Sequence, residues 1–217
     1  MAETLHEAKE PRQQRSRDSQ ERILKAAEAL IKSKGFEALT TAEVVRRSRT
    51  SIGTLYARFG DKTALLHAVQ ERVQSREEAL MRSKLAKVDW DGLSLEECVR
   101  QLLQIKRMAT EGDDRLFEAF VVHGATDPVL RAQGYRHKEA VEGLEVEILM
   151  KHAGEIGHAD PEDAARVASR LAQAAQEEYV QRSLAGGSFP GSAPPELLLQ
   201  RLADIIIAYL KNPQLAA

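Results

Sequence analysis

Aromatic residues make up only 5% of this 217-residue chain, and it has a single cysteine, Cys98. One cysteine cannot form an internal disulfide, and the scattered histidines do not give it the spacing of a zinc site. No apolar run approaches the roughly 20 residues that span a bilayer. The segment from Met1 to Gln20 is polar and charged, unlike a signal peptide. These absences predict a cytoplasmic protein that has no membrane partner.

The residues that are abundant favour helix over sheet. Hydrophobic residues account for 43% of the chain, which is ordinary for a protein that buries a core. Alanine, leucine, glutamate, arginine and glutamine are all plentiful, and these are good helix formers. The chain shows neither an alternating strand pattern nor an internal repeat. We therefore predict an all-α fold.

Charge is distributed unevenly along the chain, although the formal net charge is only −2. Residues 1–70 contain 13 basic and 9 acidic residues, whereas the remainder holds 18 of the 31 basic and 24 of the 33 acidic residues. A basic front on an acidic body suits a chain that presents one end to a polyanion. An asymmetry of this size also arises by chance.

Four helix starts are predicted in the first third of the chain. Apolar residues recur at offsets of three and four between Ser19 and Lys34, and Gly35 ends that helix. Thr40 is followed three residues later by Glu43, the spacing of a capping box, so a second helix begins there.

Ser51 and Asp61 are the N-cap candidates of the third and fourth helices. Residues 19–66 thus form a compact three-helix unit followed by a longer helix, and residues 1–18 form a disordered basic tail. Residues 67–217 form a larger helical domain with predicted helices at 94–110, 113–123, 127–153, 160–185 and 195–211, for about nine helices in total.

The stretch from Thr40 to Lys62 is a helix, a tight turn and a second helix. Val44, Val45, Leu55 and Phe59 are spaced to share a small core. In a helix-turn-helix the first helix braces the second, which enters the DNA major groove. The second helix begins with small residues that permit close approach, and it offers Tyr56 and Arg58 as longer donors.

This region resembles the TetR family of transcriptional regulators. The resemblance rests on Ser51-Ile52-Gly53-Thr54-Leu55-Tyr56, Phe59, Asp61-Lys62 and Leu65, and on Arg22-Ile23-Leu24, Ala26-Ala27, Gly35-Phe36 and Thr40. It covers about Arg22 to Val69. The family usually has Gly then Val in the turn, where this chain has Arg49 then Thr50. A left-handed conformation at Arg49 would cost of order 1 kcal/mol.

The resemblance, together with side-chain chemistry, assigns DNA-binding roles. Thr40, Tyr56 and Lys62 are expected to bind phosphates, while Ser51, Ile52, Gly53 and Thr54 are expected to face base edges. The arginines expected to add phosphate or guanine contacts are Arg47, Arg49 and Arg58, and those expected to form a minor-groove arm are Arg12, Arg15 and Arg17. Alternatively, Tyr56 packs on the turn, Lys62 is a solvated cap and the arginines form an ordinary charged face.

For the body of the chain, the resemblance implies a ligand-binding domain whose last two helices pair with those of a second subunit. The segment 160–185 is rich in alanine, and 195–211 offers a wide apolar face, which suits close packing across a two-fold axis. The alternative is that both faces are buried within one subunit. A two-fold dimer predicts a pseudo-palindromic operator.

The small-molecule effector is expected to contact apolar residues with a few polar groups. The candidates are Met108, Phe117, Phe120, His123, Tyr135, Met150 and Glu177, of which His123 and Glu177 would orient the ligand. The same residues also describe a helical core. Trp90 is predicted to be a packing anchor, and Cys98 a small buried hydrophobe rather than a redox sensor.

The sequence therefore predicts a ligand-responsive repressor that has no cofactor and is not an enzyme. An all-helical enzyme is a second hypothesis, but the chain has no Gly-rich phosphate loop, paired His/Glu metal motif or nucleophile elbow. A non-specific architectural DNA-binding protein is a third, and the net charge near zero argues against it.

Overall fold

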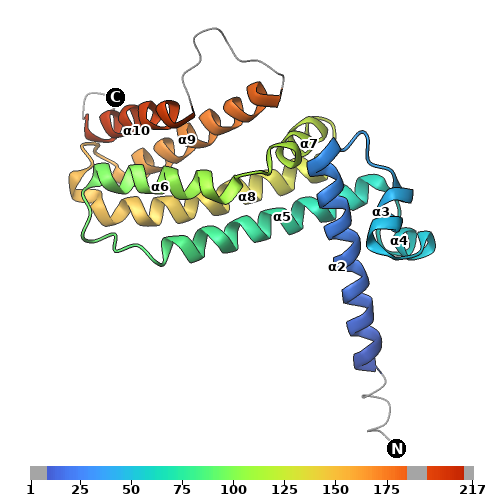
Figure 1. Ribbon diagram of the computed structural model, residues 1–217. Helices are drawn as coiled ribbons and strands as arrows, with labels where there is room; N and C mark the ends of the chain where they lie inside the picture. Colours follow the sequence, from blue (N-terminus) through green and yellow to red (C-terminus); the bar gives the residue numbers. More distant parts are fainter. Residues whose placement is uncertain (1–8, 185–194, 213–217) are drawn as a thin grey trace, which may run out of the picture. The chain divides into compact units, whose positions relative to one another are not determined.

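The computed structural model describes residues 9–184 and 195–212, and within these ranges every regular element is helical. Figure 1 shows their succession. The elements are α2 (Lys9–Lys34), α3 (Thr41–Ser48), α4 (Ile52–Phe59), α5 (Lys62–Leu85), α6 (Leu95–Thr110), α7 (Asp114–Gly124), α8 (Pro128–Leu149), the 3-10 helix η1 (Met150–Glu155), α9 (Pro161–Leu184) and α10 (Pro195–Lys211). The all-α prediction is confirmed. No helix in the described part of the chain has the length and apolar character that crossing a membrane requires.

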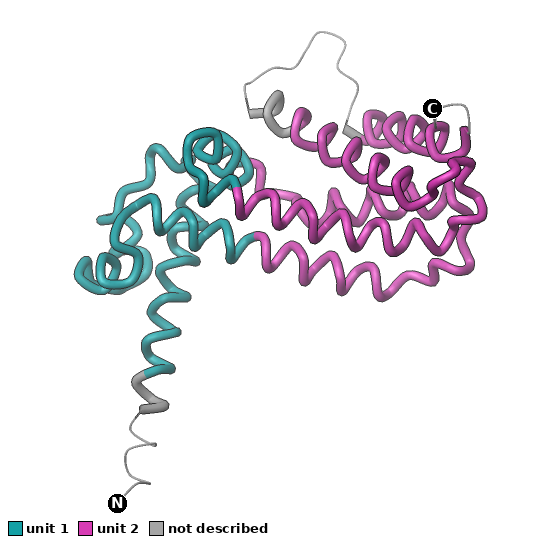
Figure 2. Tube along the Cα trace, turned by 180° about the vertical axis from the view of Figure 1, so that it is seen from behind, with its two compact units in different colours: residues 1–73, 115–131 teal, residues 74–114, 132–217 magenta. Residues whose placement is uncertain are grey.

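The chain forms two compact units (Figure 2). Unit 1 comprises residues 1–73 and 115–131, and unit 2 comprises residues 74–114 and 132–217. The predicted division after residue 66 is linear, whereas unit 1 also includes α7. The reason is that Leu116, Ala119 and Leu130 belong to the same apolar core as the first helices.

Helix α2 begins at Lys9, ten residues before the Ser19 start that the sequence predicted. Pro11 does not prevent this, because proline is tolerated in the first turn of a helix. Farther along, the Gln14 side chain donates to Asp18 at 2.8 Å, one turn away. Residues 9–18 are therefore helical rather than disordered, and only residues 1–8 of the predicted tail lie outside the described residues.

The core of unit 1 is built from the apolar stripe of α2 and from single residues of the short helices. Val44 of α3 and Leu55 of α4 are fully buried. They pack with buried residues of α2, α5, α7 and α8, among them Ile23, Ala27, Ile31, Leu65, Val69, Leu116 and Leu130. Because α3 and α4 have eight residues each, these contacts rather than helix propensity hold them in place.

The core of unit 2 lies between α6, α8, α9 and α10, with α10 packed on both α6 and α9. Trp90 is 4% exposed and its indole donates to the Leu85 carbonyl oxygen at 2.9 Å, so it is the predicted packing anchor. Cys98 is fully buried, and burial raises the pKa of its thiol to about 12. Such a thiol is a small hydrophobe rather than a redox sensor.

One predicted helix is shorter than expected. The segment 127–153 was predicted as one helix, but α8 ends at Leu149 and continues as η1. His152 interrupts η1 with non-helical angles, φ −109° and ψ 23°.

Candidate nucleic-acid interface

The first helix of the motif, α3, begins at a capped residue. Thr40 is extended, with φ −114° and ψ 147°, and its hydroxyl accepts from the Glu43 amide at 3.3 Å. The Glu43 carboxylate accepts from the Thr40 hydroxyl at 2.8 Å and pairs with Lys34. The Lys34 ammonium, and then the Thr40 hydroxyl, lower the pKa of Glu43. These contacts tie the start of α3 to the end of α2.

The turn between α3 and α4 contains Arg49 in the left-handed region, with φ 53° and ψ 45°. Among the described residues it is the one non-glycine residue with positive φ. The Thr50 amide donates to the Val45 carbonyl oxygen at 3.2 Å, and Arg22 Nε donates to the Ser48 carbonyl oxygen at 3.2 Å. The turn is thus closed by backbone hydrogen bonds although its left-handed residue is an arginine and not a glycine.

The second helix of the motif, α4, exposes most of its surface. Its N-cap, Ser51, accepts from the Thr54 amide at 3.1 Å, so the predicted start is correct. Leu55 faces the core, while Ile52 and Tyr56 are 48% and 47% exposed. Large side chains exposed to this extent are available to a partner. The Tyr56 exposure disfavours the alternative that it only packs on the turn.

The other three residues at the start of α4 are exposed or partly exposed. Ser51 and Gly53 are exposed, and Thr54 is half-buried. The Ser51 and Thr54 hydroxyls are 2.8 Å apart and bonded to each other. The four predicted base-edge residues, Ser51, Ile52, Gly53 and Thr54, are thus adjacent on one helix end.

Lys62 lies at the start of α5, where Asp61 caps the helix by accepting from the Ala64 amide at 2.7 Å. The Lys62 Nζ atom is 3.3 Å from the Glu37 carbonyl oxygen. It also lies 4.3 Å from the centroid of the Phe36 ring. An ammonium has three donor hydrogens, so one contact to a carbonyl leaves capacity for a phosphate.

The predicted arginines divide into two groups. Arg58 reaches back to α2, with its two terminal nitrogens 2.6 Å from Ser16 Oγ and 3.4 Å from Gln20 Oε1, so it braces that helix. Arg47 and Arg49 are exposed. Of the predicted arm, Arg15 and Arg17 are exposed on α2, and the Arg12 side chain lies outside the described residues.

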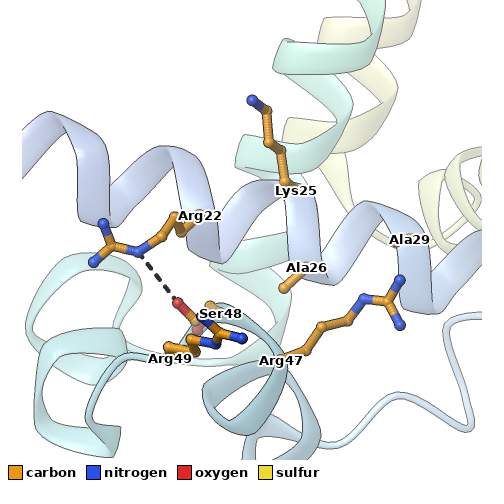
Figure 3. A pocket seen from close by; sticks show the side chains of 7 residues that line it. All are labelled: Arg22, Lys25, Ala26, Ala29, Arg47, Ser48 and Arg49. Carbon is orange, nitrogen blue, oxygen red and sulfur yellow. Dashed lines mark hydrogen bonds between the residues drawn. The ribbon is translucent and has the colours of Figure 1, made fainter.

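The structure brings two further basic residues to this region, Arg22 and Lys25, which were not among the predicted DNA-binding residues. With Arg47 and Arg49 they surround a hollow of about 390 Å³ whose remaining lining is Ala26, Ala29 and Ser48 (Figure 3). We call these seven residues the basic hollow. Arg22 and Lys25 are about one helical turn apart in the sequence, and this spacing is the sequence feature that could have identified them as candidates.

The seven predicted effector-binding residues are divided between the units. Phe117, Phe120 and His123 belong to unit 1, where His123 lies edge-on to Phe36 at 4.7 Å and pairs with Glu37 at 3.1 Å. Met108, Tyr135, Met150 and Glu177 belong to unit 2.

In unit 2, Met150 is half-buried against the core, whereas Met108 and Tyr135 are 47% and 60% exposed. Lys138 joins two of the candidates, since it pairs with Glu177 and its Nζ lies 5.9 Å from the Tyr135 ring centroid. The ligand-binding roles of the seven residues stay predictions.

The family model "Bacterial regulatory proteins, tetR family" matches residues 23–69. These residues span the helix-turn-helix and the first turns of α5. No curated protein sequence matches the chain.

Solved structures of the same fold can be aligned with nearly the whole chain. A protein from Mesorhizobium loti described as a TetR-family transcriptional regulator has 23% identity and a TM-score of 0.67, with 90% of this chain and 96% of that chain covered. Salmonella enterica GusR has 21% identity and a TM-score of 0.64, with 89% and 96% covered. A transcriptional regulator from Saccharomonospora viridis, solved in complex with choline, has 16% identity and a TM-score of 0.67, with 86% and 94% covered.

The matched segment coincides with the capped helices, the left-handed turn and the exposed face of α4. Residues 23–69 are therefore the DNA-binding domain of the TetR family of bacterial regulatory proteins, and the described chain has the fold of that family's transcriptional regulators.

Proposed function

We propose that this protein is a repressor that binds a pseudo-palindromic operator as a homodimer and is released by a small molecule. The observation that supports this best is the rotational setting of α4. Leu55 is fully buried and orients the helix, so that Ser51, Ile52, Gly53 and Tyr56 are exposed together. A capped helix presented in this way fits the major groove.

Within this proposal the DNA contacts fall into two kinds. Thr40, Tyr56 and Lys62 bind phosphates and position the domain, and Ser51 to Thr54 contact base edges. The small side chains at the N-terminal end of α4 allow the backbone to approach the groove closely.

The proposed dimer uses α9 and α10. Apolar side chains of these helices that stay exposed in the single chain are Leu171, Tyr179, Leu197, Leu198 and Ile205, with Ile205 61% exposed. By contrast, Ala164, Ala165, Ala168 and Ala172 are buried inside unit 2. The alanine face therefore packs within the subunit, and the larger apolar residues are available to a second copy.

An effector that fits unit 2 is consistent with the choline complex of the Saccharomonospora viridis regulator. In this chain Tyr135 and Glu177 carry an aromatic face and a carboxylate of the kind that bind an organic cation, and the Lys138 ammonium now contacts both, so a cationic effector would have to displace it. A thermal-shift screen that begins with choline and includes fatty acids tests for binding. A hit counts as an effector only when it also changes DNA affinity.

The proposed function is tested by selecting duplexes from a random-sequence pool with the full-length protein. We expect a palindromic site bound about 10³-fold or more tightly than random duplex, with steep salt dependence. Equal affinity for random duplex would exclude a sequence-specific repressor. Sedimentation of wild type and Ile205→Asp tests the dimer, which the variant should dissociate. The matched control is Asp204→Asn, at an exposed polar position beside it.

A further inference from the structure

The basic hollow lies beside the turn that leads into α4. We propose that it binds a backbone phosphate of duplex DNA next to the bases that α4 contacts, with Arg22, Arg47 and Arg49 as the donors. The inference rests on the proposed function only in that unit 1 binds duplex DNA. It adds Arg22 to the interface, joins it with Arg47 and Arg49 in one phosphate site, and gives the hollow a ligand.

The charge of the basic hollow is not neutralised within the described residues. In that part of the chain neither Arg22 nor Arg47 nor Arg49 pairs with a carboxylate, and of the four basic residues only Lys25 has an acidic neighbour, Glu21 at 3.3 Å. Other basic residues of unit 1 are paired with acidic ones, as Lys34 is with Glu43 and Arg72 with Glu28 and Glu21. Guanidinium groups gathered without a counterion attract an anion.

The backbone at Arg49 is strained, although the turn does not require an arginine side chain to form. At φ 53° a glycine would avoid the steric cost that arginine meets. The hydrogen bonds that close the turn are made by backbone atoms, such as Thr50 N to Val45 O, so glycine could make them equally well. Strained residues of this kind cluster at functional sites. The Arg49 side chain, whose presence causes this strain, lines the basic hollow.

The arrangement of the donors favours a long polyanion over an enclosed small ion. Arg22 and Lys25 extend from α2, and Arg47 and Arg49 from the end of α3 and the turn (Figure 3). Their side chains are exposed. The buried hydroxyl of the hollow, on Ser48, is already bonded to Val45 O at 3.2 Å and to Thr50 Oγ1 at 2.7 Å. Flexible guanidinium groups on an open surface suit a phosphodiester backbone that passes over them.

Arg22 is positioned for this role by the turn. Its Nε donates to the Ser48 carbonyl oxygen at 3.2 Å, which holds the side chain toward the turn (Figure 3). The two terminal nitrogens of a guanidinium can then donate to a phosphate. Because Ser48 lies three residues before the N-cap Ser51, the bound phosphate would flank the bases that α4 contacts.

The test measures the affinity of the full-length protein for two duplexes, one selected from a random pool and one of random sequence. Arg49→Gly and Arg47→Ala should each weaken binding to both duplexes on the order of tenfold at low salt. The salt slope should become shallower by about 1 for each protein copy bound. The matched control is Arg46→Ala, an exposed arginine of the same helix outside the basic hollow, which should change affinity by less than about twofold.

Folding is monitored in the same samples. The Tm of Arg49→Gly should equal or exceed that of wild type, because the strain at this position is relieved. Arg47→Ala lies within α3 and repeats the test without altering the turn.

Three outcomes would overturn the proposal. In the first, Arg49→Gly and Arg47→Ala behave like Arg46→Ala. In the second, the loss is confined to the selected duplex, which would make these residues base contacts. In the third, inorganic phosphate raises the Tm of wild type but not of Arg49→Gly while duplex affinity is unchanged, which would assign the hollow to a small anion. If wild type prefers no sequence, the proposed repressor function fails. The phosphate site can still be tested in that case, because the variants can be compared on the random duplex.

Discussion

The Nζ atom of Lys62 lies over the ring of Phe36, 4.3 Å from its centroid. The same ammonium contacts the Glu37 carbonyl oxygen, so two groups hold it at the start of α5. A cation held over an aromatic face loses less side-chain freedom when it later binds a phosphate. The Phe36 ring is thus part of the proposed DNA interface without contacting DNA.

Replacing Lys62 should weaken DNA binding without changing base preference. We expect Lys62→Ala to lower affinity for all duplexes on the order of tenfold, because a phosphate contact is lost. Phe36→Leu should give a smaller loss of the same kind, measurable by fluorescence anisotropy. Lys32→Ala serves as the control on α2. A changed sequence preference in Lys62→Ala would identify it as a base contact.

Thr54 and Tyr56 should differ in what their substitution changes. Tyr56→Phe removes a hydroxyl proposed to bind a phosphate and should lower affinity uniformly across sequences. Thr54→Ala should alter which base is preferred at one position of each half-site, by about 1–3 kcal/mol of discrimination. Repeating the duplex selection with each variant measures both effects. A uniform loss in Thr54→Ala would assign that residue to the backbone instead.

Stability should depend on pH through His137 of unit 2. Its ring contacts Glu77 at 3.2 Å and Glu78 at 2.9 Å. Desolvation lowers the pKa of His137, but the hydrogen bonds to Glu77 and Glu78 outweigh it and the net shift is upward from 6.5. A raised folded-state pKa means that this contribution is complete below the unfolded-state value and is lost as pH rises through the folded-state value.

The measurement is the Tm of wild type and of His137→Gln between pH 5.5 and 8.5. The difference between the two proteins should be largest at the acidic end and should shrink as pH rises. A difference that grows with pH would contradict the assignment.

The buried pair of Lys106 and Glu145 should be sensitive to the loss of one partner. Both side chains are at least nine-tenths buried, Lys106 Nζ lies 2.8 Å from Glu145 Oε1, and the Ser169 hydroxyl donates to the same carboxylate. Lys106→Met leaves an uncompensated charge and should lower the free energy of unfolding by about 3–5 kcal/mol. The double variant Lys106→Met, Glu145→Gln should recover much of that loss in urea unfolding. An additive effect of the two substitutions would show that the pair is not coupled.

The features that the sequence predicted well depend on a few neighbouring residues. Thr40, Ser51 and Asp61 cap their helices because each lies next to the amides that it accepts from. The long motif from Ser51 to Tyr56 identified the exposed helix for the same reason. Local chemistry of this kind is visible without knowledge of the rest of the chain.

The features that the sequence did not predict depend on contacts across the chain. Leu116 and Leu130 join the core of unit 1 although more than 40 residues separate them from α5's start. His123, expected beside a ligand, lies against Phe36 because α7 belongs to that unit. Arg22 reaches Ser48 across 26 residues, and nothing in the local pattern of α2 indicates that partner. Side-chain type alone did not distinguish these roles.

The burial of Leu55 alone within α4 has an evolutionary consequence. In the proposed function, substitutions at Ile52 or Gly53 change the base-edge contacts of the helix while leaving the apolar interior intact. A lineage of such proteins can therefore drift toward new target sites through single exchanges that each fold normally. Diversification of regulatory circuits is easier when the residues that choose a target are not those that maintain the shape of the domain.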